Sequence, residues 1–374
     1  MKKKVLSLLV VVMIVVLTLS VSIYFLENKD FLLLALFGKD ESNKTVVIKV
    51  EKKNLLAVSQ ENIIKYDGTI FNIFFHSLII YPEKAIKDIY NIDGYRNNML
   101  TVSQFNQVLK QLYDNNFILI DINLMYSIDE NGKIYPKKLY LPEGKKPLIL
   151  SVDDLNYYSY MKDGGFAQRL IVENNDIKTE VINPEGNRII MDGDVIPIVD
   201  SFIKEHSDFS FNGARGIIGI TGFEGILGYR TQLKDEKGSA EKEKVKVVVE
   251  ELKKHGWKFA SHSYGHDIDF YRGIVDSSFL EKDILSWKEE VESFVGPTNI
   301  YIGPYGQIFE FGDSRRDQLI KAGFNIFYGV GMGDFKNFYD NYLIMDRTNI
   351  DGYRLINNTK RLCETYGISV EESF

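Results

Sequence analysis

Beyond residue 66, the hydrophobic and polar positions fall into two alternating patterns. One is a short, continuous apolar run; the other is a longer stretch in which apolar residues recur at helical spacing. The short runs predict strands at residues 72–80, 117–122, 148–153, 216–221, 258–263, 300–302, 325–330 and 342–345. Strands that alternate with helices favour an α/β fold with a parallel sheet, either open or closed into a barrel.

Four amphipathic stretches predict the helices between these strands. The first begins at Thr101 and Gln104, which have the spacing of a capping box. The other three end near glycine, which favours the left-handed conformation that closes a helix. They cover residues 241–255 before Gly256, residues 280–294 before Gly296, and the segment between Asp313 and Gly323. The apolar stripe of each helix is interpreted as core packing.

One stretch interrupts this alternation. Residues 169–194 contain β-rich runs separated by two polar turns, at 173–176 and 183–186. This pattern predicts an antiparallel β-hairpin inserted into the α/β framework.

The beginning of the chain has the pattern of a membrane anchor. Three lysines at positions 2–4 precede an uncharged, predominantly apolar run of 22 residues, 5–26. At about 1.5 Å per residue this run forms a helix of roughly 33 Å, long enough to span a bilayer. No small-residue cleavage pattern follows, so an uncleaved anchor is preferred to a signal peptide. The lysines before the helix, with Glu27 and Asp30 after it, place the rest of the chain outside.

The chain is therefore predicted to have five parts. They are a cytoplasmic basic segment (1–4), a transmembrane anchor (5–26), a stalk (27–66), a large domain (67–360) and a C-terminal tail (361–374). The large domain carries an insertion at about 160–230. We expect a single-pass protein of the cell membrane whose large domain is extracytoplasmic, or a secreted protein if the N-terminal segment is cleaved.

Composition narrows the class of protein further. Of 374 residues, 45% are hydrophobic and 26% charged, which excludes a disordered or collagen-like chain. With 45 basic and 52 acidic residues the net charge is −7, and no basic stripe follows the first residues, so nucleic acid is not an expected partner. The only cysteine, Cys363, excludes an intramolecular disulfide and any Cys-x-x-Cys site.

Two of the predicted strands end in residues that can bind a metal ion. Asp153 and Asp154 close one strand, and adjacent carboxylates can face one centre only where the chain leaves regular strand geometry. His262 and His266 lie at the end of another strand, at a spacing that allows both to reach one metal ion. The carboxyl ends of parallel strands meet at one edge of the sheet or barrel, so we expect these side chains to lie together.

A third strand end, at residues 303–306, has the sequence Gly-Pro-Tyr-Gly, a turn whose backbone N–H groups can face an oxyanion. Asp154, His262 and His266 together make a set of two histidines and one carboxylate, which leaves coordination positions open for water and substrate. Asp153 beside them is placed to act as a base. Zinc is the default metal for such a set, and cobalt, nickel, manganese or iron fit the same ligands.

These motifs resemble those of the polysaccharide deacetylases, the NodB-like fold of carbohydrate esterase family 4. Residues 151–154 resemble the family's first motif, Thr-Phe-Asp-Asp-Gly, with Leu155 in the glycine position. Residues 262–266 match the second motif, His-Ser/Thr-x-x-His, in full. Residues 304–306 match the third motif, Arg-x-Pro-Tyr-Gly, with Ile302 in the arginine position. The resemblance covers roughly residues 67–350 and implies a distorted (β/α)7-type barrel.

The resemblance also implies a role for each residue. Asp153 is expected to be the general base, and Asp154, His262 and His266 the metal ligands. The Tyr305 backbone N–H is expected to stabilise the oxyanion. Gly303 and Pro304, which precede it, are the predicted substrate-binding residues of this loop.

Two departures from the family pattern point to one branch. Most members take the general acid from a late Leu-x-His motif, and no histidine follows His266 here. In the permuted branch of biofilm-polysaccharide de-N-acetylases, a histidine on the first strand has this role and the third-motif arginine is absent. His76 occupies the matching position. Arg230 or Arg347 is a candidate to replace the missing arginine.

The insertion after the first motif is rich in aromatic residues, namely Tyr157, Tyr158, Tyr160 and Phe166. These side chains are expected either to form a wall of the cleft or to pack in the core.

The resulting hypothesis is a metal-dependent enzyme that removes acetyl groups from N-acetylglucosamine-type units of peptidoglycan or another surface polysaccharide and releases acetate. One alternative is a non-catalytic glycan-binding or wall-organising protein on the same scaffold, motivated by Ile302, Leu155 and the enlarged insertion. A second alternative, a metallohydrolase of another amide or ester, uses the same residues. The sequence does not indicate an oligomeric state.

Overall fold

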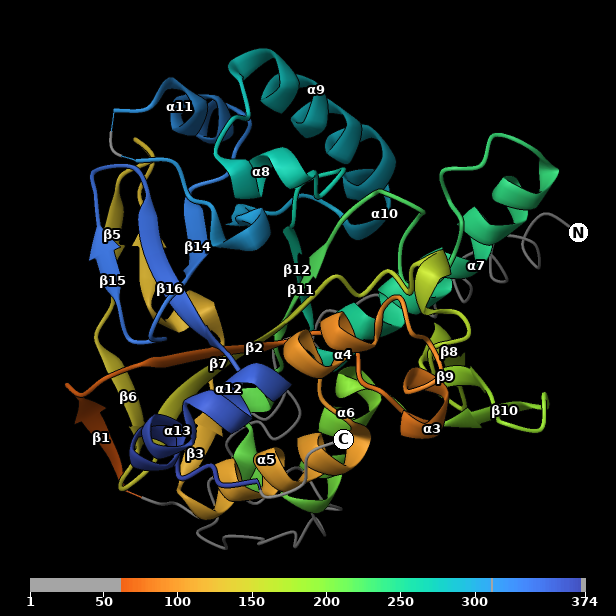
Figure 1. Cartoon of the computed structure of the whole chain (residues 1–374). Coiled ribbons are helices and arrows are strands. Elements are labelled where there is room, and N and C mark those ends of the chain that lie inside the picture. Colours follow the sequence, from red (N-terminus) through yellow and green to blue (C-terminus); the bar gives the residue numbers. More distant parts are fainter. Residues whose placement is uncertain (1–61, 311, 371–374) are drawn as a thin grey trace, which may run out of the picture. The chain divides into compact units, whose positions relative to one another are not determined.

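Seven parallel strands close into a barrel in the computed structural model, which describes residues 62–310 and 312–370 (Figure 1). Around the barrel the strands follow the order β7 (Lys146–Asp153), β11 (Ile217–Ile220), β12 (Lys258–Ser261), β13 (Ile300–Ile302), β14 (Ile326–Val330), β16 (Leu343–Asn349) and β2 (Phe71–Phe75). The ring is closed because β2 and β11 both pair with β7, in parallel. The expectation of a (β/α)7-type barrel is confirmed.

All eight strands that the apolar runs predict are present. Seven form the barrel, and the eighth, β3 (Phe117–Leu119), pairs with the beginning of β7. Five short strands have no counterpart in the prediction. They are β1 (Ile63–Tyr66), β4 (Tyr126–Ile128), β5 (Ile134–Pro136), β6 (Leu139–Pro142) and β15 (Lys336–Phe338), all in antiparallel pairs.

The four predicted helices are also present. They correspond to α5 (Val102–Asp114), α7 (Glu236–His255), α9 (Ser277–Trp287) continued by α10 (Ser293–Val295), and α11 (Ser314–Lys321). Thr101 and Gln104 form both hydrogen bonds of the capping box. Gly256 ends α7 with a φ of 100°, the left-handed conformation that glycine adopts without strain.

The remaining helices are shorter or lie in the loops. They are α3 (Pro82–Ala85), α4 (Ile92–Asn98), α6 (Val195–Glu205), α8 (Ile268–Arg272), α12 (Gly352–Asn357) and α13 (Thr359–Tyr366).

The predicted inserted hairpin is an antiparallel sheet of three strands, because the segment contains two turns. The strands are β8 (Ala167–Glu173), β9 (Asp176–Ile182) and β10 (Arg188–Met191), and β9 lies between the other two. The sheet packs on α6 and α7, outside the barrel (Figure 1).

Side chains alternate between the inside and the outside of the barrel. On β7, Leu148, Leu150 and Val152 belong to the core that packs against the helices, whereas Ile149 belongs to the separate cluster that fills the barrel. Asp153 has the same parity as Ile149 and therefore points inward, toward the residues contributed by the other strands. Polar residues at the carboxyl ends of different strands can thus meet at one end of the barrel.

The predicted transmembrane segment, residues 5–26, lies outside the described residues, as does most of the predicted stalk. Within residues 62–310 and 312–370, no helix is both long enough and apolar enough to cross a membrane.

Candidate metal centre

A cleft with a volume of about 580 Å³ opens at the carboxyl ends of the barrel strands. Residues from the loops after β2, β7, β11, β12 and β13 line it together with the ends of β14 and β16. Its lining includes His76, Asp153, Asp154, Tyr158, Tyr160, Phe223, Glu224, His262, His266, Tyr271, Gly303, Tyr305, Val330 and Asn349. Parallel-barrel enzymes place their active sites at this end.

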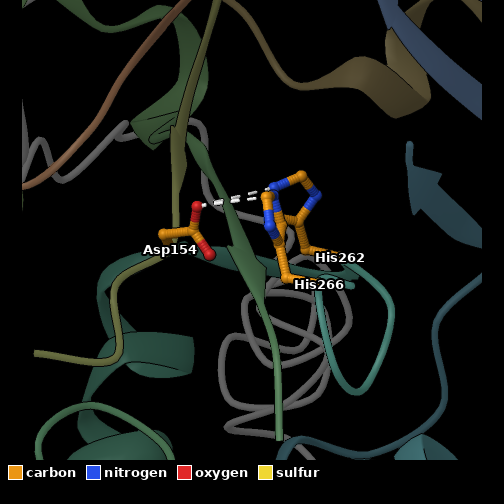
Figure 2. Close-up of side chains that lie close together, drawn as sticks. All are labelled: Asp154, His262 and His266. Carbon is orange, nitrogen blue, oxygen red and sulfur yellow. Dashed lines mark ion pairs between the residues drawn. The ribbon is translucent and has the colours of Figure 1, made fainter. Parts of the chain in front are cut away.

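The three predicted metal ligands lie together in this cleft. Figure 2 shows the Asp154 carboxylate directed at the imidazole rings of His262 and His266. Asp154 Oδ2 is 3.9 Å from His262 Nε2 and 3.7 Å from His266 Nε2. One ligand atom from each residue lies within 4.8 Å of the other two, and no further residue joins this cluster within the described part of the chain.

These distances fit a set of ligands for one divalent ion. Ligand atoms about 2.1 Å from a tetrahedrally coordinated ion are roughly 3.4 Å apart. The two distances from Asp154 Oδ2 to the histidine nitrogens exceed this value by only a few tenths of an ångström. Two imidazoles and one carboxylate leave at least one coordination position for water or substrate, as in catalytic zinc sites.

A backbone hydrogen bond fixes the tautomer of His262. Its Nδ1 lies 2.9 Å from the carbonyl oxygen of Ile302, and since a carbonyl only accepts, Nδ1 carries the proton. The lone pair of Nε2 is then free for a metal ion. Burial lowers the pKa of His262, although the neighbouring carboxylates oppose this, so the neutral ligand form is favoured.

Asp283 on α9 organises the turn that connects the two histidines. Its carboxylate accepts hydrogen bonds from the Ser263 hydroxyl at 2.9 Å and from the backbone N–H groups of Tyr264 and Gly265 at 2.8 and 3.0 Å. Ser263 and His266 have φ values of 62° and 47°, in the left-handed region that is costly for residues other than glycine. The three hydrogen bonds stabilise this strained turn and so place His266 opposite Asp154.

Asp154 is held in a defined orientation by its surroundings. Its φ of 57° departs from strand geometry, and this allows Asp153 and Asp154 to lie each 3.9 Å from His262 Nε2. The Tyr158 hydroxyl donates to Asp154 Oδ1 at 2.7 Å, which leaves Oδ2 for a metal ion. Burial by itself raises the pKa of Asp154, but the two histidines and Tyr158 outweigh it and lower the pKa to about 2.

Asp153 forms a two-point ion pair with Arg347 of β16. The two terminal guanidinium nitrogens are 2.7 and 2.8 Å from Oδ1 and Oδ2, and both side chains are nearly inaccessible to solvent. Burial raises the pKa of the Asp153 carboxyl, yet the charge and hydrogen bonds of Arg347, together with His262 and His76, outweigh burial and hold this pKa below its usual value. Asp153 therefore remains an anion and can accept a proton.

Of the two arginines considered as replacements for the missing one, Arg347 is therefore the one that pairs with Asp153, and Ile302 is buried inside the barrel. The guanidinium packs over the ring of Phe74 at 4.2 Å, a favourable cation–π arrangement. Arg230, the other candidate, does not reach Asp153. Its guanidinium donates to the backbone carbonyls of Tyr157 and Glu224 and so stabilises the loops that form one wall of the cleft.

His76 follows β2 and lines the cleft on the side of Asp153 and Asp351, whose carboxylates it influences electrostatically. Its Nδ1 lies 3.0 Å from the carbonyl oxygen of Asn98, so Nδ1 carries a proton and Nε2 takes no part in this hydrogen bond. This geometry is compatible with the predicted role as a general acid.

The loop after β13 places Tyr305 at the rim of the cleft. Tyr305 has a φ of 54°, and Gly306 and Gln307 direct their N–H groups to Gly303 and Pro304. Among the residues described, the Tyr305 N–H has no hydrogen-bond acceptor. Gly303 lines the cleft, whereas Pro304 is buried beneath it and is not part of the lining. Their assignment as substrate-binding residues stays a prediction.

The aromatic residues of the insertion divide between the two expected roles. Tyr158 and Tyr160 line the cleft, with Phe223 from the loop after β11 beside them. Tyr157 and Phe166 are buried in the core.

The chain was compared with protein-family models, curated proteins and solved structures, and it matches only some of the last group. No protein-family model matches the chain, and no curated protein matches it. Among solved structures, it is similar to the Streptococcus pyogenes deacetylase PplD in complex with acetate, with 14% identity, a TM-score of 0.42, and coverage of 80% of this chain and 98% of that one. It is also similar to a de-N-acetylase from Aggregatibacter actinomycetemcomitans (14% identity, TM-score 0.44, 79% and 99% coverage). The deacetylase domain of BpsB from Bordetella bronchiseptica has 12% identity and a TM-score of 0.37, with 75% and 97% coverage.

Proposed function

We propose that this protein is a metal-dependent hydrolase that removes acetyl groups from N-acetylglucosamine-type units of a cell-wall or surface polysaccharide. The observation that carries the proposal is the meeting, in one cleft, of three side chains that could hold a metal ion with a buried carboxylate and a histidine whose Nε2 has no hydrogen-bond partner among the described residues. With an ion bound, this set would supply a base, an acid and an electrophilic centre, which are the components that amide hydrolysis requires.

The three ligands would be Asp154, His262 and His266, with zinc as the default ion and cobalt, nickel, manganese or iron as fitting alternatives. When bound, the ion would polarise the acetamide carbonyl and lower the pKa of a coordinated water. The chain's own groups supply the rest of the chemistry. Asp153 accepts a proton from the water that attacks the carbonyl carbon, and Arg347 keeps this base ionised and fixed in orientation.

Negative charge then develops on the carbonyl oxygen as the carbon becomes tetrahedral. The Tyr305 N–H is available to stabilise this charge, because it has no acceptor among the described residues. His76 delivers a proton from Nε2 to the amide nitrogen while the C–N bond breaks. The products are acetate and a sugar with a free amine, and the proton taken up by Asp153 is balanced by the one His76 gives.

The shape of the cleft suits a sugar polymer. It is open to solvent and bordered by partly exposed aromatic side chains, including Tyr160, Phe223 and Tyr305, which are 50, 53 and 46% exposed. Flat aromatic surfaces with a few polar groups are typical of ligand sites that bind amphipathic rings. With the N-terminal anchor that the sequence predicts, we propose that the enzyme acts outside the membrane, on peptidoglycan or another N-acetylglucosamine polymer.

The main alternative is a glycan-binding protein without catalysis. Ile302, Leu155 and the enlarged insertion motivate it, since the two residues depart from the family pattern and the insertion lengthens the interval between the first two motifs. Arg347 provides the ion pair that Ile302 cannot, and Leu155 is fully buried in the core, so each departure has a structural compensation or explanation. Both observations favour the enzyme.

Acetate release distinguishes the two functions. The full chain in detergent is loaded with zinc and incubated with chitooligosaccharides, peptidoglycan and, to detect the alternative ester hydrolysis, acetylxylan. The proposal expects acetate from a glucosamine-based substrate and its loss in Asp153→Asn at an unchanged metal content. Equal release by this variant, or release only from acetylxylan, would contradict the assignment.

A further inference from the structure

A second cavity adjoins the metal cleft and has no role in the mechanism above. Its volume is about 460 Å³ and it is lined by Val330, Met332, Asn349, Asp351, Tyr353, Arg354, Asn358 and Arg361. Val330 and Asn349 line both the metal cleft and this cavity. The two spaces are therefore neighbours at the end of β14 and β16, and a molecule longer than one sugar ring can extend from one into the other.

The cavity is lined by two arginines whose guanidinium groups have no hydrogen-bond or ion-pair partner among the residues that the structure describes. All eleven arginines of the chain lie in the part that the structure describes. Nine of them have ion pairs, hydrogen bonds or other contacts there, whereas the guanidinium groups of Arg354 and Arg361 form no hydrogen bond or ion pair with any described residue. Arg354 and Arg361 both line this cavity, so guanidinium N–H donors without a partner among the described residues lie together there.

The acidic group in this cavity does not neutralise both arginines. Asp351 is its one acidic lining residue, and its carboxylate already accepts hydrogen bonds from the Arg354 backbone N–H at 2.7 Å and from the Asn349 amide at 2.5 Å. The bond from the Arg354 N–H caps α12. Electrostatic attraction to the Arg354 side chain lowers the pKa of Asp351, while burial raises it more. Two guanidinium charges face one carboxylate, so the cavity is positive.

We propose that this cavity binds an anionic substituent, a carboxylate or a phosphate, on the sugar next to the N-acetylated unit. The inference rests on the proposed function, which places that unit in the metal cleft. Guanidinium groups bind carboxylates and phosphates through paired N–H donors, and they are weakly hydrated enough to do so at a partly buried site. Tyr353 and Met332, which are 53 and 40% exposed, offer apolar surface for the sugar ring. The natural substrate is then an acidic glycan.

Binding to the metal-free protein tests this site independently of catalysis. The full chain in detergent is treated with a chelator and titrated calorimetrically with three probes. They are a neutral N-acetylglucosamine tetrasaccharide, an alternating N-acetylglucosamine–glucuronate tetrasaccharide, and a N-acetylglucosamine tetrasaccharide carrying one phosphate. We expect at least one acidic probe to bind about tenfold more tightly than the neutral one, and the tighter of the two identifies the anion.

The matched variants are Arg354→Gln with Arg361→Gln, and Lys360→Gln as the control. Lys360 is 87% exposed, lies beside Arg361 in the sequence and is outside the cavity, so its loss removes a charge without touching the site. We expect the double variant to lose the preference for the acidic probe and the control to keep it. If the double variant unfolds, Arg361→Gln alone replaces it, with an expected partial loss.

Equal affinity for all three probes, or a preference that survives removal of the arginines, would overturn the inference. Failure of the proposed anion site can be distinguished from failure of the proposed deacetylase function. Acetate release from neutral and acidic glycans with equal KM would refute only the anion site. An arginine-dependent preference in a protein that releases no acetate from any probe would uphold the site and refute the deacetylase.

Discussion

Arg347 and Asp153 are 194 residues apart in the sequence and form a two-point ion pair inside the barrel, with nitrogen–oxygen distances of 2.7 and 2.8 Å. The contact follows from the closed ring of strands, because inward positions near the carboxyl ends of β7 and β16 point into the same space. It orients the predicted base and keeps it ionised.

Replacing Arg347 by methionine should therefore change both stability and pH dependence. A buried carboxylate that loses its partner destabilises a protein by about 3–5 kcal/mol. The pKa of Asp153 is lowered by Arg347, so in the variant it rises, and a base that must be ionised loses activity as pH falls through its pKa. The acid limb of kcat/KM against pH should move to higher pH. Denaturant titration and the pH profile measure the two effects.

A conservative and a compensating variant serve as controls for this prediction. Arg347→Lys keeps the charge but not the two-point geometry, and its acid limb should lie between those of wild type and methionine variant. Arg347→Met combined with Asp153→Asn should recover part of the lost stability but no activity. An acid limb that does not move in Arg347→Met would show that Asp153 is not the base.

His76→Gln should affect substrates according to their leaving group. An amine must be protonated to leave, so the loss of a general acid should lower kcat/KM for an N-acetylated oligosaccharide by about 10²–10⁴-fold. A 4-nitrophenyl acetate ester has a leaving group that needs no proton, and its hydrolysis should change much less. Equal losses for amide and ester would argue that His76 has another role.

Tyr158→Phe should weaken metal binding without unfolding the protein. The Tyr158 hydroxyl donates to Asp154 Oδ1 and has the Thr221 hydroxyl at 2.9 Å as a second partner. Partners that orient a metal ligand contribute about 10–100-fold to affinity. Competition with a chromophoric chelator measures the change. Tyr160→Phe is the control, since no hydrogen bond joins the Tyr160 side chain to Asp154 within the described part of the chain.

Asp194, which is buried at the start of α6, should make stability depend on pH. Its carboxylate caps the helix at Val195 N–H and accepts from Leu78 N–H, yet burial raises its pKa to about 7. The unfolded value is about 3.9. The folded state therefore binds the proton more tightly than the unfolded state does. The resulting stabilisation amounts to a few kcal/mol; it is fully present below pH 3.9 and is lost as the pH rises to 7.

Asp194→Asn keeps an acceptor for both N–H groups but does not titrate. As the pH rises from 5 to 8, the unfolding free energy of the wild type should fall relative to that of this variant. A difference that is constant over this range would show that Asp194 is ionised throughout in the folded protein.

The sequence predicts the barrel strands and the metal ligands because both depend on local patterns. Continuous apolar runs mark buried strands, and a pair of histidines four residues apart at a strand end is unusual in a chain with five histidines. The role of Arg347 cannot be predicted from such a local pattern. The predicted strand ends at residue 345, because the polar residues that follow resemble a loop, whereas β16 continues to Asn349. Polar residues at the carboxyl end of a barrel strand face the site, not solvent.

Other contributions to the site have no local signal. Asp283 lies on an amphipathic helix, where a single acidic residue resembles a solvated position, and only the packing of α9 against the turn at 263–265 reveals its three hydrogen bonds. Tyr158 was expected either to form a wall of the cleft or to pack, but its hydrogen bond to Asp154 could not be read from spacing. The short strands β1, β4 and β5 are largely exposed, so they lack the continuous buried apolar run that marks the barrel strands.

One divalent ion held by Asp154, His262 and His266 is proposed to be needed for acetate release. The most direct measurement is acetate release by the full chain, stripped of metal and titrated with zinc, against an N-acetylglucosamine oligosaccharide. We predict no release from the stripped protein, a linear rise that ends at one ion per chain, and no rise in Asp154→Ala. Release by the stripped protein, or an undiminished rise in the variant, would contradict the claim.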